Sequence, residues 1–246
     1  MYIRQVVQVV TSFSEETICL PSTNAEWAAV FAGFEQLSGF PMVTGAIDGT
    51  LIRIKRLKDF EGFYCRKGFP AFNVLAVVNH KKQFIAYSIR NGAQNDQSVL
   101  NRSHFGQTIA ENLPQGAHYL GDAGYKLTRQ ILTPYPIEFG MSLQRSRYNY
   151  VHSHTRIVVE QAFGRLKGIL RMYKQPLLQH SPEYMARIII ATLVFHNWMI
   201  EHNDKTHEEQ PVTHVEDEFT LGHDDPDGLA YRDAISHELY PNYLTR

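Results

Sequence analysis

The spacing of hydrophobic residues in the first part of the chain predicts helices. Residues 1–38 have mostly helical patterns, and apolar residues recur every three or four positions between Ala25 and Leu37. A glycine and a proline, Gly39 and Pro41, interrupt this pattern. We therefore expect a helical N-terminal segment that ends at this point.

The pattern then changes to one that is typical of strands. The segment Met42–Ile54 is mostly apolar, with a small-residue and polar interruption at its middle. Two more apolar runs, Phe72–Val78 and Gln83–Ile89, are separated only by the short polar segment Asn79–Lys82. Such an arrangement predicts a β-hairpin.

The second half of the chain returns to helical spacing, with one short strand between helices. Ser98–Asn112 is predicted as a helix that ends before Pro114, and Ala117–Leu120 as a short buried strand. Two longer helices are predicted at Thr155–Tyr173 and Pro182–His202, the second with its proline in the first turn. This order of elements predicts an α/β protein whose sheet is covered by helices.

Composition places the chain among globular proteins. Of its 246 residues, 43% are hydrophobic and 20% are charged, and no apolar run reaches the roughly 18 residues that a membrane span needs. Only two cysteines are present, Cys19 and Cys65, so we expect no disulfide framework. We also expect no membrane partner.

Charge is distributed unevenly along the chain. The net charge is −1, but residues 203–246 hold 11 acidic and 3 basic side chains, which leaves a net +7 on residues 1–202. A basic body favours a polyanionic partner such as DNA, although a solvated basic surface is the simpler interpretation. The segment from Asn203 is acidic, rich in histidine and carries Pro and Gly, so we expect it to be loosely ordered.

Two aspartates occur where a site could form on the predicted sheet. Asp48 lies inside the apolar run Val43–Ile52, where an unpaired carboxylate is costly to bury. The pair Asp48-Gly49 is alternatively a tight-turn signal. Asp122 follows the short strand that ends at Leu120, and sheet strands commonly place ligand sites at such ends. A turn or helix cap is an equally good interpretation of Asp122.

Two further acids accompany them, each with a plain structural alternative. Glu160 lies beside the apolar stripe of the Thr155–Tyr173 helix, with Arg156 four residues earlier, so an ordinary helix ion pair would explain it. Asp96 lies near the predicted start of the Ser98–Asn112 helix and could cap it. Carboxylates are nevertheless the ligands that Mg²⁺ and Mn²⁺ prefer, and two such ions support phosphodiester cleavage.

The order of short motifs along the chain resembles the PIF/Harbinger superfamily of DDE transposases and the nucleases derived from Harbinger elements. The resemblance covers about residues 20–203. It is carried by six stretches, 39–50 (GFPMVTGAIDGT), 64–69 (YCRKGF), 95–98 (NDQS), 120–125 (LGDAGY), 148–167 (ending VEQAFGRLK) and 195–197 (FHN).

This resemblance implies an RNase H-like fold, a mixed five-stranded sheet flanked by helices. It places Asp48 on the first strand, Asp122 at the end of the fourth and Glu160 on the following helix, where they act in catalysis and hold two Mg²⁺ or Mn²⁺ ions. Asp96 matches a further family aspartate and is implied as a fourth metal ligand. The expected domains are a helical remnant of a DNA-binding region at 1–38, a nuclease domain at 39–202 and an acidic tail at 203–246.

The resemblance also implies residues that contact DNA. Arg156, Glu160 and Lys167 match the Arg-x₃-Glu-x₆-Lys spacing of related insertion-sequence transposases. Lys167 is the strongest candidate for a DNA contact, followed by Arg156. Arg66 and Lys67 belong to a basic stretch that could grip phosphates without reading sequence.

The implied function is that of a metal-dependent DNA endonuclease or transposase. The protein is expected in the nucleus, which it enters from the cytoplasm. The resemblance suggests a Myb/SANT-like accessory protein that supplies DNA binding and nuclear import, and homo-oligomers are also expected. Two other functions fit the same residues: a catalytically silent DNA- or protein-binding module, and a metal hydrolase of small phosphate esters. Nicking of DNA separates the first function from the second.

Overall fold

A five-stranded mixed sheet forms the centre of the molecule. The computed structural model describes residues 2–57, 61–179, 181–202 and 224–240. The strand order is β3-β2-β1-β4-β5, with β1 antiparallel to β2 and parallel to β4. The strands are β1 (Val43–Arg53), β2 (Ala71–Val78), β3 (Phe84–Asn91), β4 (His118–Leu120) and β5 (Ile131–Leu132). This is the predicted RNase H-like arrangement, and the fold class is confirmed.

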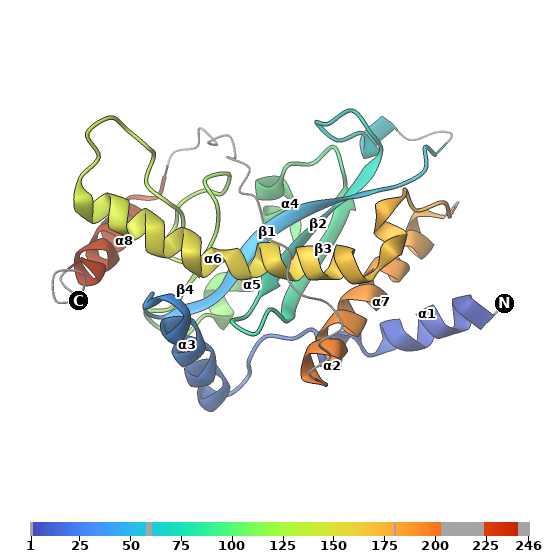
Figure 1. The fold of residues 1–246 in the computed structure, drawn as a ribbon, viewed down its shortest axis with the longest axis horizontal. Coiled ribbons are helices and arrows are strands. Elements are labelled where there is room, and N and C mark those ends of the chain that lie inside the picture. The colour runs from blue at the N-terminus through green and yellow to red at the C-terminus, as the bar shows by residue number, and fades with distance from the viewer. Residues whose placement is uncertain (1, 58–60, 180, 203–223, 241–246) are drawn as a thin grey trace.

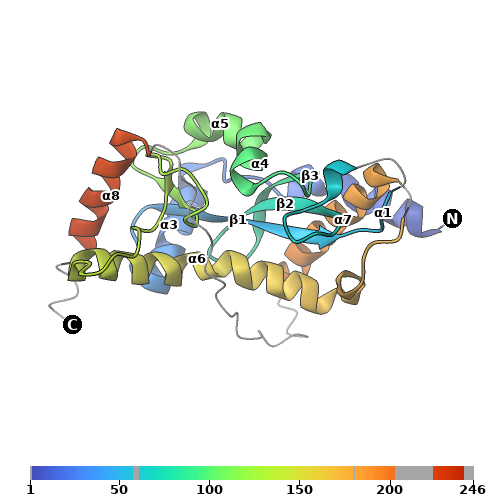
Figure 2. The same cartoon turned by 90° about the horizontal axis from the view of Figure 1, so that it is seen from above.

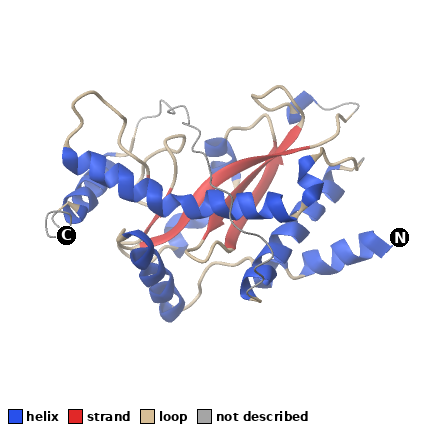
Figure 3. Ribbon diagram, viewed as in Figure 1, coloured by secondary structure: helices blue, strands red, loops and turns tan. Residues whose placement is uncertain are grey.

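Helices cover both faces of the sheet. Helices α4 and α5 lie on one face and the long helix α6 crosses the other, as the two views show (Figures 1 and 2). Figure 3 shows the strands enclosed between these layers of helix. The helices are α1 (Tyr2–Ser12), α2 (Ser14–Thr17), α3 (Asn24–Ser38), α4 (Asp96–Arg102), α5 (His104–Asn112), α6 (Leu143–Ile169), α7 (Pro182–Glu201) and α8 (Pro226–Leu239), with 3₁₀ turns η1 (Glu61–Phe63) and η2 (Arg171–Lys174).

Strand β1 runs without a break through the predicted interruption. Asp48 pairs with Ala76 and Gly49 with Leu75 in a continuous antiparallel ladder with β2. The alternative of a tight turn at Asp48-Gly49 is therefore wrong. Strand β4 pairs only with the first part of β1, up to Ala46, so Gly49 is held in extended conformation by the backbone of β2 rather than by its own propensity.

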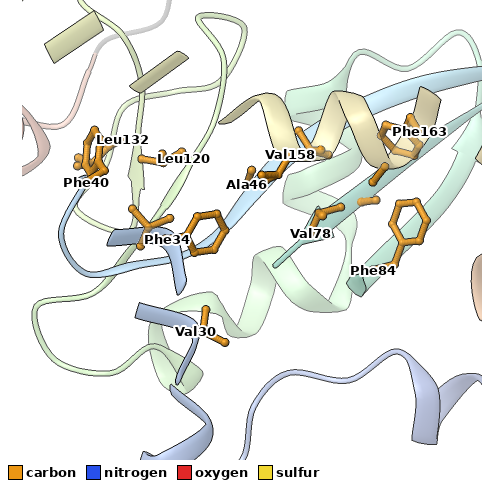
Figure 4. Close-up of a cluster of buried hydrophobic side chains, with 14 of the residues drawn as sticks. Val30, Phe34, Phe40, Ala46, Val78, Phe84, Leu120, Leu132, Val158 and Phe163 are labelled. Carbon is orange, nitrogen blue, oxygen red and sulfur yellow. The ribbon is translucent and has the colours of Figure 1, made fainter. Parts of the chain in front are cut away.

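The main core lies between the sheet and α3, α6 and α7. Phe34 of α3, Ala46 of β1 and Phe163 of α6 belong to one buried cluster, part of which is drawn in Figure 4. Val10 of α1 belongs to the same cluster, so the N-terminal helices share the core of the sheet. The origin of residues 1–38 in a DNA-binding region stays a prediction. No helix in the described part of the chain has the length and apolar character needed to cross a membrane.

Two helices differ from the expected ones. The single helix expected at Ser98–Asn112 is two helices, because Ser103 ends α4 and caps α5 by accepting a hydrogen bond from Gly106 N at 2.9 Å. Helix α6 begins at Leu143, twelve residues before the expected start. Its first turns carry Arg, Asn and Tyr residues and no apolar stripe, and a cap by Ser142 begins the helix instead.

The C-terminal region corrects the expectation of a loosely ordered tail. Residues 224–240 contain α8, which packs against α6 and β5; the rest of the acidic segment, 203–223 and 241–246, lies outside the described residues. Arg232 of α8 is 5% exposed, donates to Pro134 O at 3.1 Å and lies 4.0 Å from the centre of the Tyr135 ring. Its neighbour Asp233 accepts a hydrogen bond from Tyr135 Oη at 2.6 Å.

Removal of the Arg232 side chain should loosen α8. We expect Arg232→Ala to lower the free energy of unfolding by about 2–4 kcal/mol, since a buried cation–ring contact and a hydrogen bond to Pro134 are lost together. Urea denaturation measures the change. Arg129→Ala is the control, because the exposed Arg129 makes a similar ring contact with Tyr231 at 5.0 Å and should change stability by less than about 1 kcal/mol.

Candidate active site

The centre of β1 presents side chains to both faces of the sheet. Ala46 belongs to the core cluster beneath α6, and Thr50 accepts a hydrogen bond from Lys167 of that helix at 2.6 Å. Because side chains alternate along a strand, Asp48 points to this same face. Gly49 faces the opposite layer, where Asp96 of α4 lies against it. The predicted acids therefore approach β1 from both layers.

Asp48 is a carboxylate in a strongly perturbed environment. The pKa of Asp48 is raised to about 7, chiefly by burial; the Arg156 guanidinium opposes the shift, and the carboxylates of Asp96 and Glu160 add to it. The side chain keeps some exposed surface, and its Oδ1 accepts a hydrogen bond from Gly49 N at 2.8 Å. A buried carboxyl with other carboxylates nearby is well suited to bind an added cation.

Helix α6 carries Glu160 to the same region. Its Oε1 lies 2.7 Å from Nη2 of Arg156, one turn earlier, and both side chains are mostly buried. The ordinary ion pair considered from the sequence is thus present. The ion pair does not exclude a metal role for Glu160, because the Arg156 guanidinium also acts on Asp48 and so offsets part of the negative charge of these acids. A divalent cation would compete with Arg156 for Glu160.

Asp96 is held by strand β2 rather than acting as a helix cap. Asn95 caps α4 by accepting from Ser98 N at 2.8 Å, so the capping interpretation of Asp96 is wrong. Oδ1 of Asp96 accepts a hydrogen bond from Asn73 Nδ2 at 2.6 Å. A Cβ at position 49 would overlap this carboxylate, so the glycine is what allows Asp96 to approach the strand.

Asp122 begins the loop after β4. It is 8% exposed, and its Oδ1 accepts a hydrogen bond from Gly124 N at 2.9 Å, as the turn interpretation expects. Tyr125 follows in the same turn and donates its backbone N–H to Asp122 O at 3.2 Å. The carboxylates of Asp96, Asp48 and Asp122 all act electrostatically on the Tyr125 phenol. The loop therefore brings Asp122 into the region of the other acids.

Lys167 of α6 also lies near Asp48. Its ammonium donates to Thr50 Oγ1 at 2.6 Å and to Leu51 O at 3.3 Å. Burial lowers the pKa of Lys167 to about 8; Asp48 opposes this and Lys67 adds to it. Lys67 and Arg66 are exposed in a tight turn closed by Gly68 N donating to Cys65 O at 2.9 Å. Two of the predicted DNA contacts, Lys67 and Lys167, thus lie near one another.

The residues that sequence reasoning missed surround these acids. Asn73 holds Asp96, Gly49 makes room for it, and Thr50 fixes Lys167. Asn73 sits in an ordinary strand pattern and carries no signal of its own. The small residue directly after Asp48 was the one available signal, and a tight turn was its alternative interpretation.

The donor set fits a hard divalent cation, although the carboxylates are not closed around one. Within the described residues, no three His, Cys, Asp or Glu side chains are grouped closely enough to hold an ion as they stand. All four candidates offer carboxylate oxygens, which Mg²⁺ and Mn²⁺ prefer. Burial raises the pKa of Asp48 even though the Arg156 guanidinium lies close enough to oppose the shift. Cation binding would draw the acids together.

The fold and these acids define a class, that of RNase H-like nuclease domains with carboxylates contributed by separate elements. The chain belongs to the DDE superfamily of endonucleases, whose family model matches residues 47–197. The match begins just before Asp48 and includes Asp96, Asp122 and Glu160.

Curated relatives agree with this assignment. The chain is 26% identical over 235 residues to "Putative nuclease HARBI1" of Xenopus laevis, covering 94% of this chain and 67% of the relative. It is 28% identical over 204 residues to the human protein of the same name, covering 81% and 58%. "Protein ALP1-like" of Arabidopsis thaliana is 26% identical over 226 residues, covering 85% and 55%. No solved structure matches the chain significantly.

Binding of a divalent cation should depend on pH. The cation must displace the proton that Asp48 holds below its pKa of about 7, so the affinity for Mn²⁺ should fall about tenfold per pH unit below 7 and level off above it. Isothermal titration calorimetry between pH 5.5 and 8.5 measures this. An affinity that stays constant from pH 5.5 to 7 would contradict the role of Asp48.

Proposed function

We propose that this chain is a metal-dependent DNA endonuclease domain of the transposase type. The observation that carries the proposal is Asp48, a carboxylate at the centre of the sheet whose pKa is raised to about 7 beside Asp96 and Glu160. Structural carboxylates are usually exposed or fully paired, whereas perturbed ones gather at functional sites. The family assignment makes nuclease chemistry the natural use of such a group.

Asp48, Asp122 and Glu160, with Asp96 as a fourth ligand, would hold two Mg²⁺ or Mn²⁺ ions. Ions held in this way activate a water for attack on a phosphodiester and stabilise the departing 3′-oxygen. Basic side chains of the protein would supply the contacts with DNA. Lys167, with Arg156 and the exposed Arg66 and Lys67, would contact DNA phosphates and orient the strand without reading its sequence.

Nicking of supercoiled plasmid tests the proposal. Wild type should nick in Mg²⁺ or Mn²⁺ and lose activity with EDTA, whereas Asp122→Asn and Glu160→Gln should be at least about a hundredfold slower. Glu35→Gln, an exposed acid on α3, is the control and should nick normally. DNA binding without nicking by any of these proteins would favour the binding module instead.

Loss of the Lys167 ammonium should weaken DNA binding. We expect Lys167→Met to bind DNA about tenfold more weakly on all sequences and to reduce the slope of log affinity against log salt by about 1, because one phosphate contact is lost. Fluorescence anisotropy at several salt concentrations measures both quantities. Lys81→Met, in the exposed turn between β2 and β3, should leave them unchanged.

The accessory Myb/SANT-like protein, homo-oligomers and nuclear localisation belong to the same proposal. The accessory protein would supply the sequence recognition that phosphate contacts lack. Co-purification with tagged full-length chain from nuclei, and light scattering of the purified protein, test the two kinds of partner.

A further inference from the structure

One buried hydroxyl lies among the acids without a hydrogen-bond partner. Tyr125 is 3% exposed, and its Oη makes no hydrogen bond with any group in the described residues. Burying a hydroxyl without a partner costs free energy, and native proteins seldom leave one so. Other buried tyrosines of this chain have partners: Tyr148 donates to Thr133 O at 3.4 Å and Tyr135 to Asp233 at 2.6 Å.

The ring of Tyr125 is fixed on the α4 side of the sheet. It packs in the cluster that includes Ile47 of β1 and Val99 of α4. A Cβ at position 121 would press on this ring, so Gly121 lets it lie against the end of β4. Since the backbone turn at Asp122 also holds it, the phenol has little freedom to find a partner elsewhere.

Three of the candidate metal ligands act electrostatically on the phenol. Burial raises the pKa of Tyr125 well above its ordinary value, and the carboxylates of Asp96, then Asp48 and Asp122, raise it further. The hydroxyl therefore keeps its proton at any working pH and can act only as a donor towards these acceptors. Asp96 has the largest effect, and one of its oxygens already accepts from Asn73.

We propose that Tyr125 is a positioning residue of the site, whose hydroxyl donates a hydrogen bond to the Asp96 carboxylate when a divalent cation is bound. The inference rests on the proposed function. A carboxylate that binds a cation retains lone pairs for other donors, and such outer hydrogen bonds fix its orientation. Asn73 of β2 donates one hydrogen bond to Asp96. Tyr125, from the loop after β4, donates a second one when the carboxylates bind the cation.

Comparison of two tyrosine variants tests this role. Tyr125→Phe keeps the ring and removes only the hydroxyl. Tyr119→Phe is the matched control, since Tyr119 is equally buried in the same cluster but its phenol is not affected by the acids. Calorimetry and Mn²⁺ electron paramagnetic resonance report the ion affinity, and thermal unfolding without metal reports the fold.

Tyr125→Phe should bind Mn²⁺ about tenfold more weakly while its unfolding temperature without metal stays the same or rises, because no hydrogen bond is lost in that state. In nicking assays, the Mn²⁺ concentration that gives the half-maximal rate should rise by a larger factor than the factor by which the maximal rate falls. Tyr119→Phe should bind Mn²⁺ like wild type.

Unchanged Mn²⁺ affinity in Tyr125→Phe, beside a wild type that binds and nicks, overturns the role of Tyr125 alone. A wild type that binds no Mn²⁺ overturns both this inference and the proposed function.

Discussion

Asp48→Asn should abolish nicking while making the metal-free protein more stable at pH 8. We expect the rate to fall about a thousandfold or more, which corresponds to roughly 4 kcal/mol of lost transition-state stabilisation. The amide keeps the shape of the side chain but cannot carry the negative charge that a divalent cation needs. Plasmid nicking at saturating DNA and Mn²⁺ measures the loss.

The gain in stability follows from the pKa of Asp48. Burial raises that pKa from 3.8 to about 7, so between about pH 4 and pH 7 the folded protein keeps a proton that the unfolded chain has released. Stability therefore falls as pH rises through this window, and at pH 8 the wild type bears the full cost. The shift corresponds to an upper limit of about 4 kcal/mol, and the partial exposure of Asp48 makes about 1–2 kcal/mol the expected gain.

Urea denaturation at pH 5 and pH 8 checks this part. Asp48→Asn should exceed wild type by more at pH 8 than at pH 5. Asp227→Asn, at the exposed start of α8, should show no such difference. A variant that is inactive because it is unfolded at both pH values would contradict the expectation.

Gly49→Ala should inactivate the protein through Asp96 rather than through the fold. The added methyl would overlap the Asp96 carboxylate, which must then leave Asn73. The end of one side chain can move aside while the β1–β2 ladder persists, so we expect a loss of about 1–2 kcal/mol in stability. Displacement of a metal ligand by about an ångström should slow nicking about a hundredfold and weaken Mn²⁺ binding.

A control variant on another element and a double variant separate a general effect of the added methyl group from its effect on Asp96. Gly164→Ala, on α6, meets open space and removes a helix glycine, so it should leave nicking unchanged. The double variant Gly49→Ala with Asp96→Ala should be no slower than Asp96→Ala alone, since the overlap is then gone. Additive losses would mean that the methyl acts elsewhere.

The sequence by itself determined most of the elements and the identity of the candidate acids. Two apolar runs around a short polar segment placed the β2–β3 hairpin, and helical spacing placed α7, almost to the residue, because such patterns reflect which positions are buried. The same reasoning failed at α8, whose charged sequence is ordered by contacts of Arg232 and Tyr231 with distant segments. The same reasoning also predicted too late a start for α6, whose first turns carry no apolar stripe.

Only the tertiary structure decided how the acids are used. No local pattern distinguishes Asp48-Gly49 in a turn from the same pair in a strand, because the difference lies in pairing with β2. Likewise, the contact between Gly49 and Asp96, the support from Asn73 and the unpartnered hydroxyl of Tyr125 join residues far apart along the chain. Short-range propensity identifies elements, whereas desolvation and charge at a site depend on which elements packing brings together.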